Sequence, residues 1–232
     1  MKRILTILIL LCSLLLTACN NASIGVIGGA DGPTSIIVSE KNIGKTLSYT
    51  IEEYFRDNYV DERKLPVLDI DIENPFVSDD RTLVLDDSID NSIEFTIYKY
   101  YHSIMSGSYQ GTKSMIIGEA LLSATENEEK NFNDGIYFSK IILDEIDLVD
   151  KDDLNEISSK NKQDIVEMLV EAEIEEFAIV EVEKTIKHNE KSLSMAPQVG
   201  DGEVTRYFLL GKKDGSYSYK IIDVYWEGFM ND

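Results

Sequence analysis

The residues best suited to ion chemistry lie near the N-terminus, in the segment GGADGPTSI, which runs from Gly28 to Ile36. Asp31 supplies a carboxylate and Thr34 a hydroxyl, and the glycines let the backbone turn its carbonyl groups toward a bound ion. Carboxylate, hydroxyl and carbonyl oxygens are the ligands that hard cations prefer. The composition of this segment is therefore compatible with a cation site formed by Gly28, Gly29, Asp31, Gly32, Pro33 and Thr34.

A second residue with its own chemistry is Cys19, which ends the sequence LTAC. Lys2 and Arg3 precede the apolar run ILTILILLCSLLL, which is shorter than the roughly 20 residues of a membrane-spanning helix. This order resembles the signal peptide and lipobox of bacterial lipoproteins. The resemblance implies cleavage before Cys19 and acylation, with a diacylglyceryl thioether on its sulfur and often a third fatty acid such as palmitate. Several acyl chains hold a protein on a membrane far more firmly than one.

The cysteine count and the charge agree with a lipid-anchored protein on the extracytoplasmic face of the cell membrane. Cys12 would be lost with the signal peptide, residues 1–18, and the lipid would occupy Cys19, so no thiol would remain for disulfides, metal binding or catalysis. The sequence contains 43 acidic and 22 basic residues and has a net charge of −21. Such an acidic cell-surface protein repels nucleic acid. We expect membrane attachment through the lipid, and a protein or small-molecule partner.

The hydrophobic pattern predicts an α+β domain from residue 86 to residue 232, preceded by a tether and N-terminal extension over residues 19–85. Asn91, Glu94 and Gly107 are typical of the two ends of a helix. Asp214-Gly215 is typical of a tight hairpin. Residues 65–88 are interrupted by prolines and predict irregular structure with one edge strand. The predicted helices span residues 45–59, 91–107, 114–125 and 160–173, and the predicted strands lie within 136–150, 177–188, 203–213 and 216–226.

The order of helices followed by strands resembles the nuclear-transport-factor-2-like fold, also called cystatin-like or SnoaL-like. The resemblance rests on SIEFTIYKYYHSIMSGSYQ as an opening aromatic helix and on KKDGSYSYKIIDVYW as a closing hairpin. In the second segment Tyr219 stands where the family commonly has Trp. The resemblance implies N-terminal helices packed on a curved antiparallel sheet that forms a cone.

One carboxylate in the closing strand is a candidate general base. Strand alternation predicts that Tyr219, Ile221, Asp223 and Tyr225 share one face. In enzymes that the fold resembles, a carboxylate facing into the cone acts as a base when burial raises its pKa. Asp223 would then have Tyr98 or Tyr101 as a hydrogen-bond partner. The alternative is that Asp223 faces outward and that Tyr98, Tyr101, Tyr219 and Tyr225 are pocket or core residues without catalytic function.

No other pattern in the sequence predicts catalysis. His102 and His188 are the only histidines and lie far apart in the chain. There is no phosphate-binding glycine loop, zinc-ligand spacing or serine elbow. We therefore expect no cofactor and no metal.

The glycine-rich segment also closely resembles a signature of the beta subunit of sodium-translocating oxaloacetate decarboxylases. The resemblance implies that Asp31 corresponds to the ion-binding carboxylate, surrounded by Gly28, Gly29, Gly32, Pro33 and Thr34. That subunit is a polytopic membrane protein, whereas this sequence has no apolar run beyond the signal. We expect the segment from Ile24 to Ser39 to be a structural or docking element rather than a sodium site.

Three functional hypotheses follow from the sequence. The first is a non-enzymatic lipoprotein whose α+β domain binds a ligand or a partner. The second is an accessory subunit of a membrane complex related to the sodium-translocating decarboxylases, docked through residues 24–39. The third is a small enzyme of the cone fold that uses Asp223.

Overall fold

The computed structural model of the chain describes residues 24–29, 32–39 and 46–230, and describes side chains from residue 50 onward. The chain forms two compact units, Met1–Glu53 and Tyr54–Asp232. The predicted signal peptide, Cys19 and Asp31 lie outside the described residues.

Three antiparallel strands form the sheet of the first unit, in the order β1-β2-β3. They are β1 (Ile24–Gly29), β2 (Gly32–Ser39) and β3 (Thr46–Tyr49). The glycine-rich segment flanks the connection between β1 and β2, where Gly29 pairs with Gly32 and the register shifts between Ile27 and Gly28.

The helix predicted over residues 45–59 is shorter, because residues 46–49 form β3 and α2 spans Ile51–Asn58. Thr50 fixes the start of α2 in a reciprocal capping arrangement. Its hydroxyl accepts a hydrogen bond from the Glu53 backbone N–H at 3.2 Å, and its own N–H donates to the Glu53 carboxylate at 2.9 Å.

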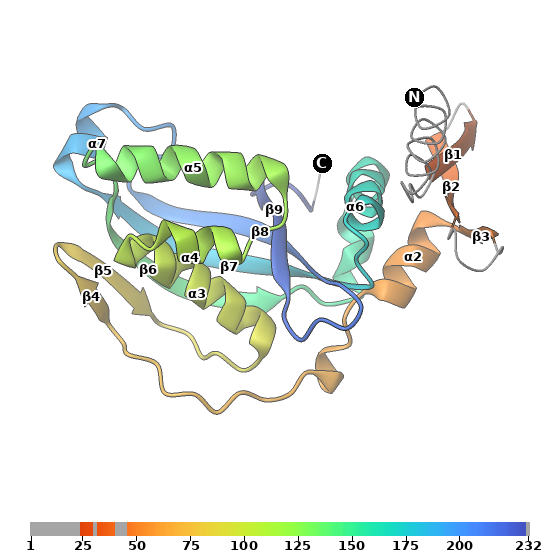
Figure 1. Cartoon of the computed structure of the whole chain (residues 1–232), viewed down its shortest axis with the longest axis horizontal. Coiled ribbons are helices and arrows are strands. Elements are labelled where there is room, and N and C mark those ends of the chain that lie inside the picture. The colour runs from red at the N-terminus through yellow and green to blue at the C-terminus, as the bar shows by residue number, and fades with distance from the viewer. Residues whose placement is uncertain (1–23, 30–31, 40–45, 231–232) are drawn as a thin grey trace, which may run out of the picture. The chain divides into compact units, whose positions relative to one another are not determined.

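A curved, unclosed six-stranded sheet is the centre of the second unit, in the order β4-β5-β6-β7-β8-β9 (Figure 1). All neighbouring strands are antiparallel except β5 and β6, which are parallel. The mixed α+β class and the curved sheet predicted from the sequence are thus confirmed, but the sheet is mostly rather than wholly antiparallel. The strands are β4 (Phe76–Ser78), β5 (Arg81–Leu85), β6 (Phe138–Leu148), β7 (Glu176–His188), β8 (Gly202–Lys212) and β9 (Lys220–Trp226).

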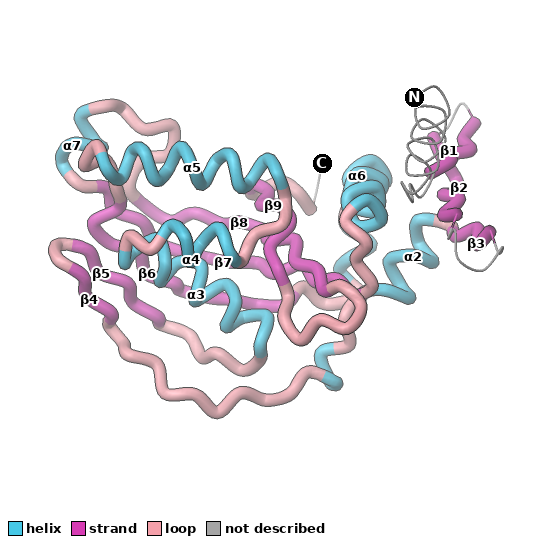
Figure 2. Tube along the Cα trace, in the orientation of Figure 1, coloured by secondary structure: helices cyan, strands magenta, loops and turns pink. Residues whose placement is uncertain are grey.

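The sheet begins earlier in the chain than the sequence predicted, because β4 and β5 precede the first long helix. The expected domain boundary at Asp86 therefore lies inside the second unit, and Phe55, Tyr59 and Leu83 from before that boundary are core residues. β4 is the predicted edge strand, while the loop over residues 65–75 contains no helix or strand (Figure 2).

The first long helix, α3, spans Ser92–Ser106 and has the predicted ends. The Asn91 side chain accepts hydrogen bonds from the N–H groups of Ile93 and Glu94, at 2.9 and 3.1 Å. Gly107 ends the helix in the left-handed conformation, with φ of 75°. Its backbone also makes room for neighbours, since a Cβ there would lie 2.8 Å from the Phe132 ring.

The helix predicted over residues 114–125 is right only for residues 119–125, because that region contains the end of one helix, a short connection and the start of a second helix. The two helices are α4 (Tyr109–Ser114) and α5 (Glu119–Asn133). The residues between them bond to β9, with the Ile117 N–H donating to the Ile221 carbonyl at 2.9 Å. Ile116 is buried in this connection as predicted, whereas Ala120, predicted to face inward, is exposed.

The helix predicted over residues 160–173 is confirmed as α6 (Ser159–Glu171), in which Ile165 and Leu169 are fully buried. The hairpin between β8 and β9 contains the predicted Asp214-Gly215 turn, and Gly215 has φ of 68°. The remaining elements are α7 (Glu190–Ser194) and the short 3-10 helices Glu62–Lys64 and Asp153–Glu156.

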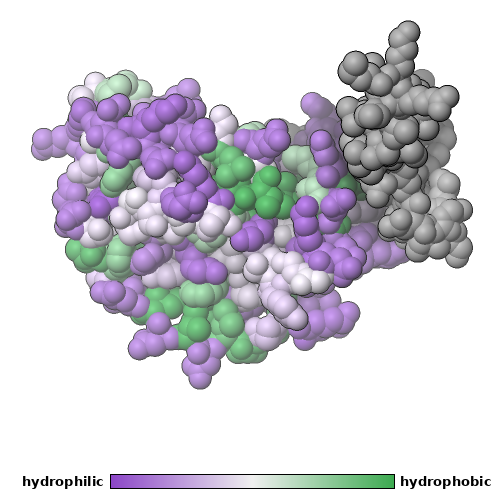
Figure 3. All heavy atoms as spheres, viewed as in Figure 1, coloured by the Kyte–Doolittle hydropathy of each residue, from purple (hydrophilic) through white to green (hydrophobic). Residues whose placement is uncertain are grey.

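Helices α3, α4 and α5 cover one face of the sheet (Figure 1). Phe208 on β8 meets the rings of Tyr100 and Tyr101 on this face. Phe177 on β7 projects from the opposite face, against the rings of Phe55 and Tyr59 with centroids 5.1 and 5.2 Å away. The outer surface over α5 is predominantly hydrophilic (Figure 3). Among residues 24–29, 32–39 and 46–230, no helix is both long and apolar enough to cross a membrane.

Candidate ligand-binding site

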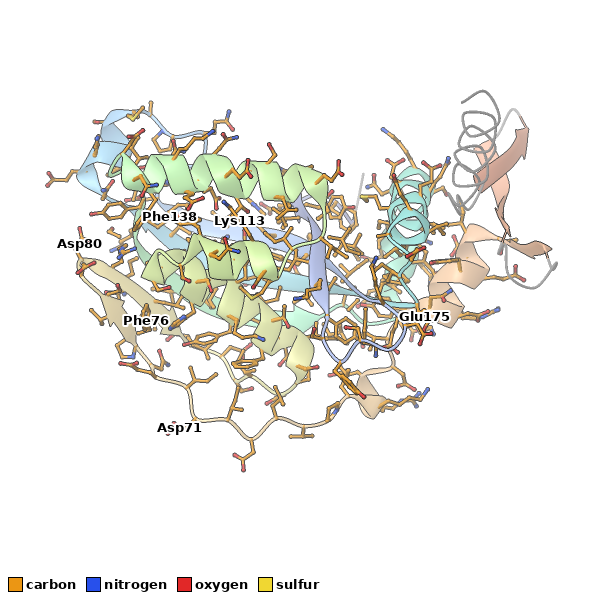
Figure 4. The ribbon with its side chains drawn as sticks, in the orientation of Figure 1. Asp71, Phe76, Asp80, Lys113, Phe138 and Glu175 are labelled. Atoms are coloured by element: carbon orange, nitrogen blue, oxygen red, sulfur yellow. The ribbon has the colours of Figure 1, made fainter. Side chains whose placement is uncertain are left out.

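A cavity of about 320 Å³ lies on the helix-covered face, between the ends of α3 and α5 and the loop that carries α7. Its walls are largely apolar with a few polar side chains, which is the usual composition of a small-molecule site. Phe138, at the start of β6, lies close to the end of α5 (Figure 4). The lining residues are Arg81, Ile104, Met105, Tyr109, Glu128, Asn131, Ile136, Tyr137, Phe138, His188, Ser192, Met195 and Pro197.

Arg81 is the buried cation of this cavity. Strand alternation in β5 places Arg81, Leu83 and Leu85 inward, and the Arg81 side chain is only 6% exposed. Its guanidinium lies 4.6 Å from the centre of the Phe132 ring, a favourable cation–π contact. Nη2 donates to Asp79, which is itself 85% exposed, while Nη1 is buried without a hydrogen-bond partner. The positive charge of Arg81 is therefore only partly compensated.

Glu128 is the acidic residue of the cavity wall and lies half-buried on the inner side of α5. It lies one helical turn before Phe132, so that both side chains face the cavity region. Its Oε2 atom is buried without a hydrogen-bond partner. Burial raises the pKa of the Glu128 carboxyl, and the positive charge of Lys184 partly opposes this rise. Burial and the charge of Glu128 also raise the pKa of the cavity residue Tyr109.

Helices α4 and α5 are held together beside the cavity. Lys113 on α4 forms an ion pair with Glu129 on α5 at 2.6 Å and lies between the two helices (Figure 4). Glu129, the next residue after Glu128, is thus paired with a residue of the neighbouring helix. Unlike Glu128, it does not line the cavity.

The loop over residues 189–201 lines one side of the cavity and is anchored at both ends. Asp201 accepts hydrogen bonds from the His188 backbone N–H at 2.8 Å and makes a 2.9 Å contact with its Nδ1 atom. These contacts lower the pKa of the Asp201 carboxyl. At the other end, the Asn189 side chain donates to the Gly135 carbonyl at 2.8 Å. His188 is thereby oriented with its ring against Phe138, in the cavity wall.

The four tyrosines predicted as pocket residues do not form one pocket, and none lines this cavity. Tyr98 and Tyr101 are buried on α3, where Tyr98 donates weakly to the Glu73 carbonyl and Tyr101 accepts a hydrogen bond from Lys184. Tyr219 bonds to Glu176 and borders a separate hollow of about 350 Å³. Tyr225 stacks on Phe229, with ring centroids 4.2 Å apart.

The predicted shared face of Tyr219, Ile221, Asp223 and Tyr225 is wrong, because β9 contains a bulge. Ile221 pairs with Leu210 and Asp223 pairs with Leu209, so Ile222 is an extra residue between them. Asp223 and Tyr225 consequently lie on the face away from α3, where neither Tyr98 nor Tyr101 is a partner. Burial raises the pKa of Asp223, but its carboxylate accepts the N–H of its own neighbour Val224.

The candidate cation segment is only partly described, because Asp31 lies outside the described residues. The strands around it place Gly28 opposite Pro33 and Gly29 opposite Gly32. Within the described ranges, no three His, Cys, Asp or Glu side chains form a group that could hold a metal ion.

The sequence reasoning missed Arg81 and Glu128, although each carries a recognisable signal. Arg81 is the only basic residue between Lys64 and Lys99, and it occupies an inward position of an alternating strand. Glu128 follows Leu121 and Thr125 at helical spacing, on the inner side of α5. His188 was noted only as one of two histidines that lie far apart in the chain, and its partner Asp201 is separated from it by a loop.

No protein-family model, curated protein or solved structure matches the chain. The chemistry of the cavity is therefore inferred from the residues that line it. A donor at Arg81, an acceptor or neutral acid at Glu128 and an oriented imidazole at His188 surround an apolar interior. This arrangement can bind a compact molecule that has an apolar body and more than one polar group.

Proposed function

We propose that this protein is a lipid-anchored, extracytoplasmic binding protein whose α+β domain holds a small molecule in the cavity between α5 and the sheet. The observation that carries the proposal is the cavity itself, with Arg81 and Glu128 in its wall. Each has one buried polar atom that lacks a hydrogen-bond partner, and leaving such an atom unsatisfied costs about 1–3 kcal/mol. A ligand with complementary polar groups would recover that free energy.

The size and lining of the cavity support a small ligand rather than a peptide. A volume of about 320 Å³ is at the lower end of the range for small-molecule sites. The side chains of Ile104, Met105 and Ile136 supply the apolar surface. Helices over one face of a curved sheet are also compatible with the nuclear-transport-factor-2-like cone, which we propose as the fold family.

A thermal-shift screen of small molecules against the full-length protein tests this function, because a ligand that binds only the folded state raises its Tm. We expect stabilising compounds to combine an apolar body with an acidic or carbonyl group. Arg81→Met and Glu128→Gln should each weaken their binding at least tenfold. Glu129→Gln is the matched control, since Glu129 has the same chemistry on the same helix but pairs with Lys113 outside the cavity.

Compounds that stabilise the wild type and all three variants equally would show that binding occurs elsewhere. Absence of any stabilising compound from a broad screen would favour the reading of the domain as a surface for a protein partner. Titration calorimetry on the best compound then gives the affinity of each variant directly.

A further inference from the structure

Lys184, Arg206 and Trp226 form a row across three neighbouring strands, on the sheet face covered by α3 and α5. Arg206 on β8 pairs directly with Trp226 on β9 and with Val182 on β7, which makes Lys184 its diagonal neighbour. The Arg206 guanidinium lies 3.6 Å from the centre of the Trp226 ring. Because β9 is the edge strand and Trp226 is 59% exposed, the row leads inward from the edge of the sheet.

Within the part of the chain that the structure describes, neither cation of this row has a carboxylate within ion-pair distance, although Glu128 acts on Lys184 and Glu227 acts on Arg206 from farther away. Among the described residues, neither Lys184 nor Arg206 belongs to an ion pair, although the sequence has 43 acidic residues against 22 basic ones. Arg206 donates to the Thr205 carbonyl, and the Lys184 ammonium donates to the Tyr101 hydroxyl at 2.5 Å. Two partly buried cations side by side attract an anionic group.

The surroundings of Lys184 favour its neutral amine. Burial and the positive charge of Arg206 lower the pKa of Lys184 to about 7, against the opposing effect of the Glu128 carboxylate. Burial also raises the pKa of Tyr101, which keeps its hydroxyl neutral and able to exchange protons with the amine. A neutral lysine amine beside a fixed cation is the activated form of the nucleophile that attacks carbonyl groups.

We propose that Lys184 forms an imine with small carbonyl compounds that carry an anionic group, such as 2-oxo acids, and that Arg206 binds the anionic group. The amine nitrogen adds to the carbonyl carbon, and the carbonyl oxygen takes up a proton relayed from the nitrogen through the Tyr101 hydroxyl. The carbinolamine then loses water to give the carbon–nitrogen double bond. One carbonyl compound and one amine thus yield one imine and one water, with no oxidant or reductant.

This inference goes beyond the proposed function, because Lys184, Arg206 and Trp226 do not line the cavity described above. Its test is reductive trapping of the full-length protein with glyoxylate and cyanoborohydride, which converts an imine into a stable secondary amine. Peptide mass spectrometry then identifies the modified lysines. Lys187 is the internal reference, since it lies on the same strand, is exposed and projects from the opposite face.

We expect Lys184 to be modified at least tenfold faster than Lys187 at pH 7. The rate at Lys184 should reach half its maximum near pH 7, whereas an ordinary lysine has a pKa of about 10.4. Modification of exposed lysines with Lys184 left unmodified in the wild type would overturn the proposal. Because this result comes from the wild-type protein, it stands even if a variant fails to fold.

Substitutions of Lys184 and Arg206 test the function that we propose for each residue. Lys184→Arg should abolish the modified peptide, and the control Lys187→Arg should leave it unchanged. Arg206→Gln should raise the pH midpoint of labelling and lower the preference for glyoxylate over the neutral acetaldehyde at least threefold. An unchanged preference in Arg206→Gln would overturn the assignment of Arg206 as the anion-binding residue.

Discussion

Arg81, Glu128 and Lys184 are charged residues placed where the protein offers them few partners. Arg81 has one unpartnered guanidinium nitrogen, Glu128 has one unpartnered carboxylate oxygen, and Lys184 has a phenol rather than a carboxylate as its nearest partner. Each arrangement costs folding free energy, since a buried polar group is stabilised only when it is bonded. Arg81 and Lys184 project from the helix-covered face of the sheet, and Glu128 projects from α5 toward that face. The space between this face and the helices is the region where we place binding and chemistry.

The charge of Lys184 should make the stability of the protein depend on pH. Its pKa is lowered to about 7 in the folded state from an ordinary value of 10.5. Between these values the unfolded chain binds a proton that the folded chain lacks, so stability rises with pH across this range. We expect Lys184→Met to be more stable than the wild type at pH 7, by on the order of 1 kcal/mol, because a desolvated ammonium is removed.

Urea denaturation of both proteins at pH 7 and pH 10 measures this effect. The difference between wild type and Lys184→Met should shrink at pH 10, where the unfolded lysine has begun to lose its proton. Titrating groups that do not interact with Lys184 cancel in the difference. A constant difference at both values of pH would contradict a lowered pKa for Lys184.

At the scale of elements, the close approach of α5 to β9 fixes how the helix lies over the sheet. Gly118 immediately precedes α5, and a Cβ at this position would lie 1.8 Å from the Ile222 carbonyl oxygen. Only glycine allows this contact, because the obstacle is backbone rather than a flexible side chain. The same contact region holds the bulge at Ile222 that turns Asp223 away from α3.

Gly118→Ala should therefore destabilise the protein by about 3 kcal/mol or more, because the helix must move away from the strand. Chemical denaturation followed by circular dichroism measures the loss. Gly200→Ala is the control, since no atom lies within 4 Å of the added methyl group, and it should change stability by less than about 1 kcal/mol. Equal effects of both substitutions would show that α5 does not depend on this contact.

Elements that are determined by neighbouring residues were predicted correctly, whereas elements that depend on contacts with distant parts of the chain were not. The ends of α3 were predictable because Asn91, Glu94 and Gly107 act on their own helix. The break between α4 and α5 was not predictable, because it depends on hydrogen bonds from residues 115–117 to a strand about a hundred residues later. The face of Asp223 was mispredicted for the same reason, since a bulge is set by the register with β8.

The cavity was beyond sequence reasoning because its walls come from distant parts of the chain. Arg81, Tyr109, Glu128 and His188 belong to four different elements or their ends. The local signals of Arg81 and Glu128 mark them as inward-facing, but only the fold brings the four residues together. The general class of the domain, by contrast, could be read from hydrophobic periodicity and turn residues.

At the scale of the whole molecule, the proposed lipid at Cys19 would tether the binding domain to a membrane. Cys19→Ser should abolish incorporation of labelled fatty acid and release the protein from membranes, because the thioether cannot form. Cys12→Ser is the matched control, since Cys12 lies within the predicted signal and should leave labelling intact. Metabolic labelling with an alkyne fatty acid, together with membrane fractionation, measures both outcomes. Continued labelling of Cys19→Ser would contradict lipidation at this residue.

The parallel pairing of β5 with β6 has a consequence for the order in which the domain assembles. In the sequence, helices α3, α4 and α5 all come between these two strands. A long stretch of chain must therefore be ordered before β5 can pair with β6. Strands β7, β8 and β9 follow one another directly in the sheet and close shorter loops. Because local contacts form faster than distant ones, we expect the C-terminal meander to nucleate folding and β5 to dock late. A chain that emerges N-terminus first would thus expose β5, including Arg81, until synthesis or export is nearly complete.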